Sequence, residues 1–305
     1  MDTNAEEHYI KRGDPTKPTY YIIRGFEETM GLFARYIIYA GHIRYALSNG
    51  RLPVVDMQNY SNMYLPPEKL GQENSWEYYF EQPLRIGLEQ AYSGENVILS
   101  KAGIVVPCPN DGISFYENRN NELTEWRMLV KLGLLKIKPA LQQEILVTRE
   151  KLFSPQDRVL GVLLRGTDYL SERPQNHPIP PPIEFAASMV VVKLREWKCN
   201  KIFLATEDKN ILQIFKNFFG DLCVTFDREY IDYIPGKQLG SCSIDRANDH
   251  FQLGKDYLSQ MVLLSTCTSF MAARCSGSVG VRMLANNFEN TYFFNLGRYG
   301  MISLD

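Results

Sequence analysis

The sequence has few of the residues from which metal and redox sites are built. Its 305 residues include six cysteines and four histidines. No two cysteines form a C-x-x-C pair and the histidines are widely dispersed, so the pattern indicates neither a zinc site nor a redox motif. Free thiols in a reducing cytoplasm are the simplest interpretation of these cysteines.

Signals for membranes, nucleic acids and ATP hydrolysis are also missing. The formal net charge of -2 provides no overall field for recruiting nucleic acid or an anionic membrane. No apolar run approaches the length of a spanning helix, and the acidic N-terminus is unlike a secretory signal. The sequence contains no Walker A motif, and its first glycine loop is not a dinucleotide fingerprint. We therefore expect a cytoplasmic protein with at most peripheral membrane contact and no nucleic-acid partner.

Apolar runs alternate with helical patterns along the chain. In the first half, strands are predicted at 20–23, 52–56 and 96–99, with a helix over 32–47. The second half is more regular, with predicted strands at 159–164, 201–205, 222–225, 269–272 and 291–294. Helices are predicted between these strands. After the third strand, we expect a loop to about Gly254, then a helix over 256–267, and then the fourth strand. Such alternation predicts an α/β protein with parallel sheets.

The length accommodates two domains of ordinary size. A polar stretch at 154–158 separates the two patterns, and we place the domain boundary there. The sequence therefore predicts one α/β domain over 1–155 and a second over 156–305.

Polar residues follow three of the strands predicted in the second half: Arg165 with Asp168, Glu207-Asp208 and Ser276-Gly277-Ser278. In a doubly wound sheet these strand ends lie on one edge, and ligands bind in the crevice outside that edge. A planar guanidinium suits a phosphate, and the hydroxyls and N–H groups of a helix start attract anions. The three together predict a site for a phosphorylated ligand that is held without a metal.

Each of these features also has an ordinary structural interpretation. Arg165 would then pair with a local carboxylate, and Ser276 would be a plain N-cap. Glu207 and Asp208 would be the acidic first turn of a helix. The combination favours a ligand site, because charges gathered at one buried edge are costly unless they are paired.

Four segments of the second half resemble, in order, the motifs of one enzyme family. Residues 163–168 are similar to the H-x-R-R-T-D segment of α1,6-fucosyltransferases and the related nodulation and protein O-fucosyltransferases. Segments 177–179, 203–208 and 264–279 resemble the family's H-P-I, L-A-T-D-D and L-S-x-(A/C)…S-S-x-V motifs. The resemblance is weaker in the first half, where the glycine loop and residues 74–80 are similar.

The resemblance implies a GT-B-like fold, with two Rossmann-like doubly wound domains facing a cleft. Domain 156–305 would bind the donor, and domain 1–155 would be the acceptor side. It further implies a fucosyltransferase that moves fucose from GDP-fucose with inversion and without a metal or other cofactor. The acceptor would be an oligosaccharide or lipid-linked glycan, in the biosynthesis of a surface polysaccharide such as a bacterial capsule.

The resemblance also implies roles for single residues. Arg165 would bind the diphosphate, and Asp168 would brace it. Glu172, in a proline-rich loop, is the candidate base that takes the proton from the acceptor hydroxyl. His42 is a weaker candidate on the acceptor side, since most histidines in such helices belong to the core or the surface. The donor pocket would be lined by Arg165, Gly166, Glu207, Asp208, Gln260, Ser276, Gly277 and Ser278.

Three departures from the family pattern leave alternatives open. Leu163 replaces the family histidine and Gly166 its second arginine, while Gln260 stands where an acid reads the guanine edge. Asp256, one helical turn earlier, is a possible substitute for that acid. The alternatives are a transferase of the same fold that uses another nucleotide sugar, and a non-catalytic protein that binds nucleotide sugars or glycans.

Overall fold

The chain divides into two compact units, which we describe separately. The computed structural model describes residues 8–25, 27–105, 107–109, 120–166, 173, 175–232 and 245–300. Unit 1 comprises Met1–Gln142 and Ile244–Leu258, and unit 2 comprises Gln143–Ser243 and Ser259–Asp305. The chain passes from one unit to the other within α5 (Pro139–Leu152) and again within α9 (Asp249–Ser265).

The sheet of unit 1 has the order β1-β4-β2-β3. Its strands are β1 (His8–Lys11), β2 (Thr19–Arg24), β3 (Leu52–Asp56) and β4 (Asn96–Leu99). The pairs β2–β3 and β2–β4 are parallel, and β1 runs antiparallel to β4 at the edge. The three strands predicted in the first half are therefore confirmed. The exposed strand β1 was not predicted.

Helices cover both faces of this sheet. Leu88 and Ala91 of α3 (Leu88–Ser93) pack against Ile22, Val54 and Val97 on one face. On the other face, α1 contacts β2 and β3, and many of its side chains are buried. Besides the parts of α5 and α9 that belong to this unit, its described helical elements are α1 (Leu32–Ser48), η1 (Pro67–Lys69), α2 (Trp76–Tyr79), α3 and α4 (Asn120–Lys131).

An aromatic cluster joins α1, α2 and the first half of α9. Trp76 stacks on Phe80 with ring centroids 4.3 Å apart, and Phe251 stacks on Tyr79 at 5.7 Å. Gly254 lies so close to Tyr79 that an added Cβ would be 2.9 Å from its Cε1. The predicted loop up to Gly254 is therefore wrong, because α9 begins at Asp249 and buries this turn against unit 1 aromatic rings.

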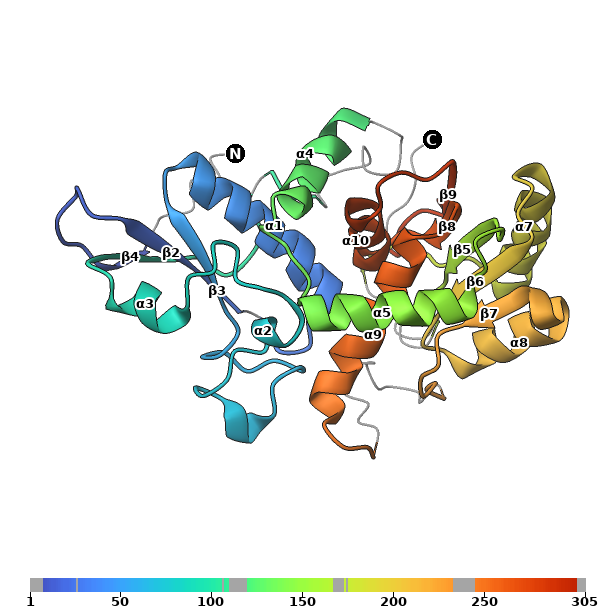
Figure 1. The fold of residues 1–305 in the computed structure, drawn as a ribbon, viewed down its shortest axis with the longest axis horizontal. Helices are drawn as coiled ribbons and strands as arrows, with labels where there is room; N and C mark the ends of the chain where they lie inside the picture. The colour runs from blue at the N-terminus through green and yellow to red at the C-terminus, as the bar shows by residue number, and fades with distance from the viewer. Residues whose placement is uncertain are drawn as a thin grey trace. The chain divides into compact units, whose positions relative to one another are not determined.

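The sheet of unit 2 is parallel throughout, with the order β7-β6-β5-β8-β9. Its strands are β5 (Val159–Leu163), β6 (Lys201–Ala205), β7 (Cys223–Thr225), β8 (Ser269–Ala273) and β9 (Asn290–Phe294). In chain order this is 3-2-1-4-5, the arrangement of a doubly wound nucleotide-binding sheet. The α/β fold class and the five strands predicted here are confirmed (Figure 1).

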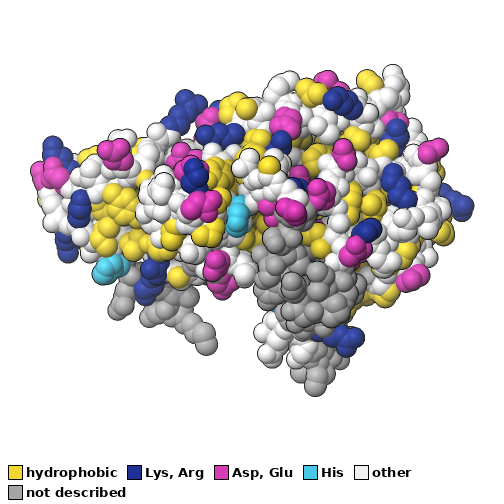
Figure 2. Space-filling model, turned by 90° about the horizontal axis from the view of Figure 1, so that it is seen from below, with side chains coloured by type: hydrophobic (Ala, Val, Ile, Leu, Met, Phe, Trp, Pro, Cys, Tyr) yellow, Lys and Arg dark blue, Asp and Glu magenta, His cyan; other side chains and the backbone are white. Residues whose placement is uncertain are grey.

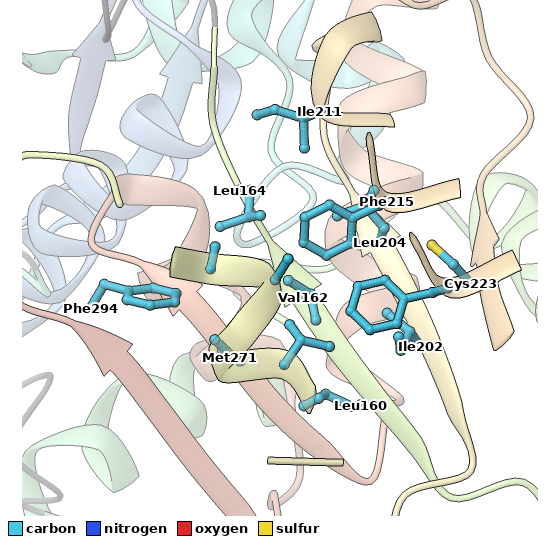
Figure 3. Close-up of a cluster of buried hydrophobic side chains, with 14 of the residues drawn as sticks. Leu160, Val162, Leu164, Ile202, Leu204, Ile211, Phe215, Cys223, Met271 and Phe294 are labelled. Carbon is cyan, nitrogen blue, oxygen red and sulfur yellow. The ribbon is translucent and has the colours of Figure 1, made fainter. Parts of the chain in front are cut away.

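The core of unit 2 lies between this sheet and the helices that follow β5 and β6. Leu160, Val162 and Leu164 alternate along one face of β5 and contact buried side chains of the neighbouring strands (Figure 3). Phe215 of α8 and Val190 of α7 belong to the same cluster. Besides the parts of α5 and α9 that belong to this unit, its described helical elements are α7 (Ile183–Glu196), α8 (Lys209–Phe219), η3 (Gly220–Leu222) and α10 (Ser276–Leu284).

The surface carries charges of both signs. Figure 2 shows one face of the molecule, on which basic and acidic side chains are interspersed among hydrophobic ones. No helix in the described ranges is long and apolar enough to cross a membrane.

Candidate functional site

The register of the unit 2 sheet brings the polar strand ends to one level. Leu163 pairs with Ala205 on one side and Ala272 on the other. Extending this register by two residues places Arg165 level with Glu207 and Arg274, just beyond the carboxyl ends of β6 and β8. The strand order reverses between β5 and β8, and ligands of open α/β sheets bind at such a switch point. We call the carboxyl ends of β5, β6 and β8, with the start of α10, the unit 2 edge.

Arg165 is the central cation of the unit 2 edge. Its side chain is 23% exposed, and its Nε lies 3.9 Å from Oε1 of Glu207, which is itself 10% exposed. That distance places the two opposite charges next to each other, although it is too long for a hydrogen bond between these two atoms. The same Glu207 oxygen accepts a hydrogen bond from the backbone N–H of Gly166 at 3.3 Å. Glu207 thus holds the turn after β5 and offsets part of the charge of Arg165.

Alternation along β5 indicates the face on which Arg165 lies. Gly161 and Leu163 precede it at even spacing, and an added Cβ at Gly161 would lie 3.0 Å from Leu264 Cδ2 of α9. Right-handed crossovers place α9 and α10 on this face and α7 and α8 on the opposite one. Arg165 therefore belongs to the face that carries α10.

Gly166 and Asp208 belong to the opposite face, and they touch. Asp208 is the N-cap of α8, and its Oδ1 accepts hydrogen bonds from the N–H groups of Asn210 at 2.8 Å and Ile211 at 3.0 Å. A Cβ added to Gly166 would lie 2.6 Å from Asp208 Cγ. The glycine found where the family has a second arginine is therefore required by the position of the Asp208 side chain.

The start of α10 completes the unit 2 edge. Ser276 is its first residue and is half-buried, while Gly277 and Ser278 are buried. The Ser278 hydroxyl accepts from the backbone N–H of Cys275 at 3.1 Å and donates to the carbonyl of the same residue at 2.7 Å. Ser278 therefore stabilises the turn, and Ser276 and the N–H end of the helix are the groups suited to an anion.

Gln260 bridges two loops of unit 2. Its Nε2 donates to the carbonyl of Thr206 at 3.1 Å, and its Oε1 accepts from Arg228 Nη1 at 3.1 Å. The side chain is 2% exposed. Gln260 thus connects Thr206, just after β6, to the segment after β7. Of its two partners, Arg228 is the more exposed.

His42 lies in the core of unit 1. Its Nε2 is 2.9 Å from the carbonyl of Gly103, which only accepts, so that nitrogen carries the proton. Its Nδ1 then accepts from the Tyr21 hydroxyl at 3.0 Å. Burial lowers the pKa of His42, which favours this neutral form. Both ring nitrogens are engaged, and we leave His42 out of the proposed acceptor site.

Two predicted site residues, Asp168 and Glu172, lie outside the described residues. The sequence pattern gave no sign of Arg274 or Arg228. Arg274 lies between an apolar strand and a serine turn, and it comes level with Arg165 only when the register of β5 and β8 is extended by two residues. Within the ranges that the structure describes, no group of three or more His, Cys, Asp or Glu side chains is arranged to hold a metal ion.

A doubly wound parallel sheet with polar groups at its switch point defines the class of Rossmann-like nucleotide-binding folds. Within that class, the chain is similar to solved fucosyltransferases. NodZ from Bradyrhizobium matches with a TM-score of 0.53 and 18% identity, covering 93% of this chain and 97% of that one. POFUT1 in complex with GDP matches with a TM-score of 0.55 and 9% identity, covering 94% and 100%. A variant of Arabidopsis thaliana FUT1 in complex with GDP matches with a TM-score of 0.50 and 12% identity, covering 92% of this chain and 71% of that one.

At identities this low, the similarity to these structures shows the fold alone. No protein-family model and no curated protein matches the sequence. The chain therefore has the GT-B-like α/β fold of the fucosyltransferases, as its four motifs predicted.

Proposed function

We propose that the chain is an inverting, metal-independent glycosyltransferase that moves fucose from GDP-fucose to a hydroxyl of a glycan. The observation that carries this proposal is Arg165 at the switch point of a doubly wound sheet, beside the start of α10. Two fucosyltransferase structures support the choice of donor. One is a NodZ α-1,6-fucosyltransferase soaked with GDP-fucose, and the other is POFUT1 in complex with GDP-fucose.

The proposed chemistry follows from the charges at the unit 2 edge. As the bond to the sugar breaks, the sugar becomes similar to an oxocarbenium ion and the departing diphosphate gains negative charge. The guanidinium of Arg165 and the N–H groups at the start of α10 stabilise that charge. The planar guanidinium of Arg165 suits the phosphate oxygens, and the neighbouring acid Glu207 keeps the arginine side chain in place.

The remaining roles are carried over from the motifs. Asp168 braces Arg165, and Glu172 takes the proton from the acceptor hydroxyl. Gly166 permits close approach at the strand end, and Asp208 fixes the first turn of α8. The acceptor is an oligosaccharide or lipid-linked glycan of a surface polysaccharide assembled in the cytoplasm.

A donor panel tests this proposal. The purified chain is mixed with GDP-fucose, GDP-mannose and UDP-glucose, and both its melting temperature and the release of nucleotide are measured. GDP-fucose is expected to raise the melting temperature most and to be the one donor that is hydrolysed or transferred. Glu172→Gln is expected to keep the shift in melting temperature and to lose turnover. Absence of any shift with all three donors would contradict the proposal.

A second donor is a specific alternative, because Gln260 replaces the acid expected to read guanine. Both ends of its amide are already bonded, to Thr206 and Arg228. A larger shift with UDP-glucose than with GDP-fucose would favour a transferase for another nucleotide sugar. Binding without turnover, and without any effect of Glu172→Gln, would favour a non-catalytic binder.

A further inference from the structure

Unit 1 has a polar strand edge of its own, which the proposed donor site does not use. Arg24 ends β2 and pairs in register with Asp56 at the end of β3. The backbone N–H of Arg24 donates to Ser100 Oγ, just after β4, at 3.1 Å. Because β3 and β4 lie on opposite sides of β2, this is the switch point of the unit 1 sheet. We call these three strand ends, with Tyr60, the unit 1 edge.

The side chains of the unit 1 edge lie on the face covered by α3. Arg24 follows Ile22 at even spacing, and Ile22 packs against α3. Asp56 Oδ2 accepts from the hydroxyl of Tyr92 in α3 at 2.7 Å. Tyr60 packs over the next turn, since a Cβ added to Gly25 would lie 3.1 Å from Tyr60 Cβ. A guanidinium, a carboxylate and two phenols therefore surround one strand end.

The carboxylate of Asp56 is already satisfied. Its Oδ1 accepts from the backbone N–H groups of Gln58 at 2.9 Å and Asn59 at 3.0 Å. Its Oδ2 accepts from Asn59 Nδ2 at 2.8 Å, in addition to the Tyr92 hydroxyl. These four donors satisfy the carboxylate oxygens from within the chain. The Asp56 side chain therefore stabilises the loop after β3.

The guanidinium of Arg24 is satisfied only in part, by a hydrogen bond with Tyr60. Its Nε is buried and has no hydrogen-bond partner in the described part of the chain. A buried donor without an acceptor is costly, and nearly all such groups in folded proteins have a partner. The Nε–H and the adjacent Nη–H of a guanidinium form a fork that matches the two oxygens of a carboxylate or phosphate. An oxygen pair from a bound ligand would supply the acceptor that Nε lacks, beside the hydrogen bond that the guanidinium makes with Tyr60.

The charge at the unit 1 edge fits an anion. A second guanidinium, that of Arg35, is fully buried at this end and donates to the carbonyls of Met30 at 3.2 Å and Glu27 at 2.5 Å. The positive charges of two guanidinium groups thus exceed the negative charge of the single Asp56 carboxylate. The side chains of Glu27 and Glu28 are exposed to solvent, which screens their charge.

We propose that the unit 1 edge binds an oxyanion of the acceptor glycan, with the Arg24 guanidinium as its bidentate partner and the Tyr60 hydroxyl as a further donor. The identification of the ligand as an acceptor rests on the proposed function, whereas the anion site itself does not. Burial and the charge of Asp56 raise the pKa of Tyr60, and Arg24 lowers it less, so the phenol keeps the proton that it donates. The acceptor is then an acidic or phosphorylated glycan.

Calorimetric titration of the full chain tests this site. The probes are glucuronate, inorganic phosphate and neutral glucose, so that a carboxylate and a phosphate source are compared directly. Glucuronate or phosphate is expected to bind, and the tighter of the two identifies the source. Arg24→Gln is expected to weaken binding of that anion by at least about tenfold, the loss expected for hydrogen bonds to a charged group. The control is Arg51→Gln, an arginine just before β3, at the opposite end of the sheet.

Two measurements keep this test separate from the donor proposal. GDP-fucose should raise the melting temperature of Arg24→Gln as much as that of the unchanged chain, because the donor site is in unit 2. If Arg24→Gln fails to fold, Tyr60→Phe should still weaken anion binding several-fold. Equal anion affinity in the unchanged chain and in both variants, or glucose binding as tightly as glucuronate and phosphate, would overturn the proposal.

Discussion

His42 shows how burial changes the chemistry of one residue. The sequence shows a histidine on a helix near a glycine loop, which is compatible with a ligand site or with the core. In the structure its two nitrogens bond to Tyr21 and Gly103, and its side chain is fully buried. A titratable group held neutral in this way links folding to pH.

The stability of the chain should therefore fall in mild acid. Burial lowers the pKa of His42 from its ordinary value of 6.5, so below that pH the unfolded chain binds a proton that the folded chain does not. The stabilisation is present above 6.5 and is lost as the pH falls toward the lowered pKa, by at most about 1.4 kcal/mol per pH unit. The free energy of unfolding, measured with urea at about pH 7.5 and about pH 5.5, should be smaller at the lower pH.

The matched variants for this prediction are His42→Gln and His177→Gln. His42→Gln should reduce the difference in unfolding free energy between the two pH values. His177 is exposed, and its replacement should leave that difference unchanged. An equal pH dependence in all three proteins would show that His42 titrates normally in the folded state.

The sequence located single residues where a strand end determines their position, whereas their roles stay predictions. The apolar run before Arg165 and the one before Glu207 placed both residues at the carboxyl edge of the sheet. The sequence did not reveal that Arg274 lies level with Arg165, or that Gln260 bonds to Arg228. Strand register and contacts between distant loops depend on tertiary packing, which no local pattern encodes.

At the scale of the element, α8 depends on its contact with the strand end before it. Asp208 caps the helix, and its carboxyl group lies against Gly166. The amphipathic pattern of this helix buries Ile211, Phe215 and Phe219 in the core of unit 2. A displaced cap would therefore disturb both the candidate site and the packing of α8.

Gly166→Ala is expected to destabilise the chain by about 1–3 kcal/mol, from the lost cap and the steric overlap with Asp208. The midpoint of urea unfolding should fall with little change in slope. Gly87→Ala is the control, because nothing lies within 4 Å of a Cβ added there. Equal midpoints for the two variants would mean that Asp208 moves away at little cost.

The elements that the sequence missed are those with weak local signals. Strand β1 is exposed along its whole length, so it has no buried face to give an alternating pattern. The first turns of α9 are polar and contain Gly254, which favours a loop in isolation. Burial of Phe251 against Tyr79 overrides that preference. The strands of unit 2 were predictable because both faces of a parallel sheet are covered.

At the scale of the whole molecule, each unit has a parallel sheet with a polar switch point. Unit 2 carries Arg165 and unit 1 carries Arg24, each at the end of the first parallel strand of its sheet. In our proposals, the first binds the donor diphosphate and the second an anionic group of the acceptor. The division into donor and acceptor sides remains a prediction from the family resemblance.

The central claim is that Arg165 is the counter-ion of the donor diphosphate, and the most direct test is a calorimetric titration with GDP. Arg158 lies at the opposite end of the same strand and pairs with Glu289 at 3.2 Å, which makes Arg158→Gln the matched control. Arg165→Gln should weaken GDP binding by about 10- to 100-fold, and Arg158→Gln should leave it unchanged. Equal affinity in the two variants, or no binding of GDP by the unchanged chain, would contradict the account.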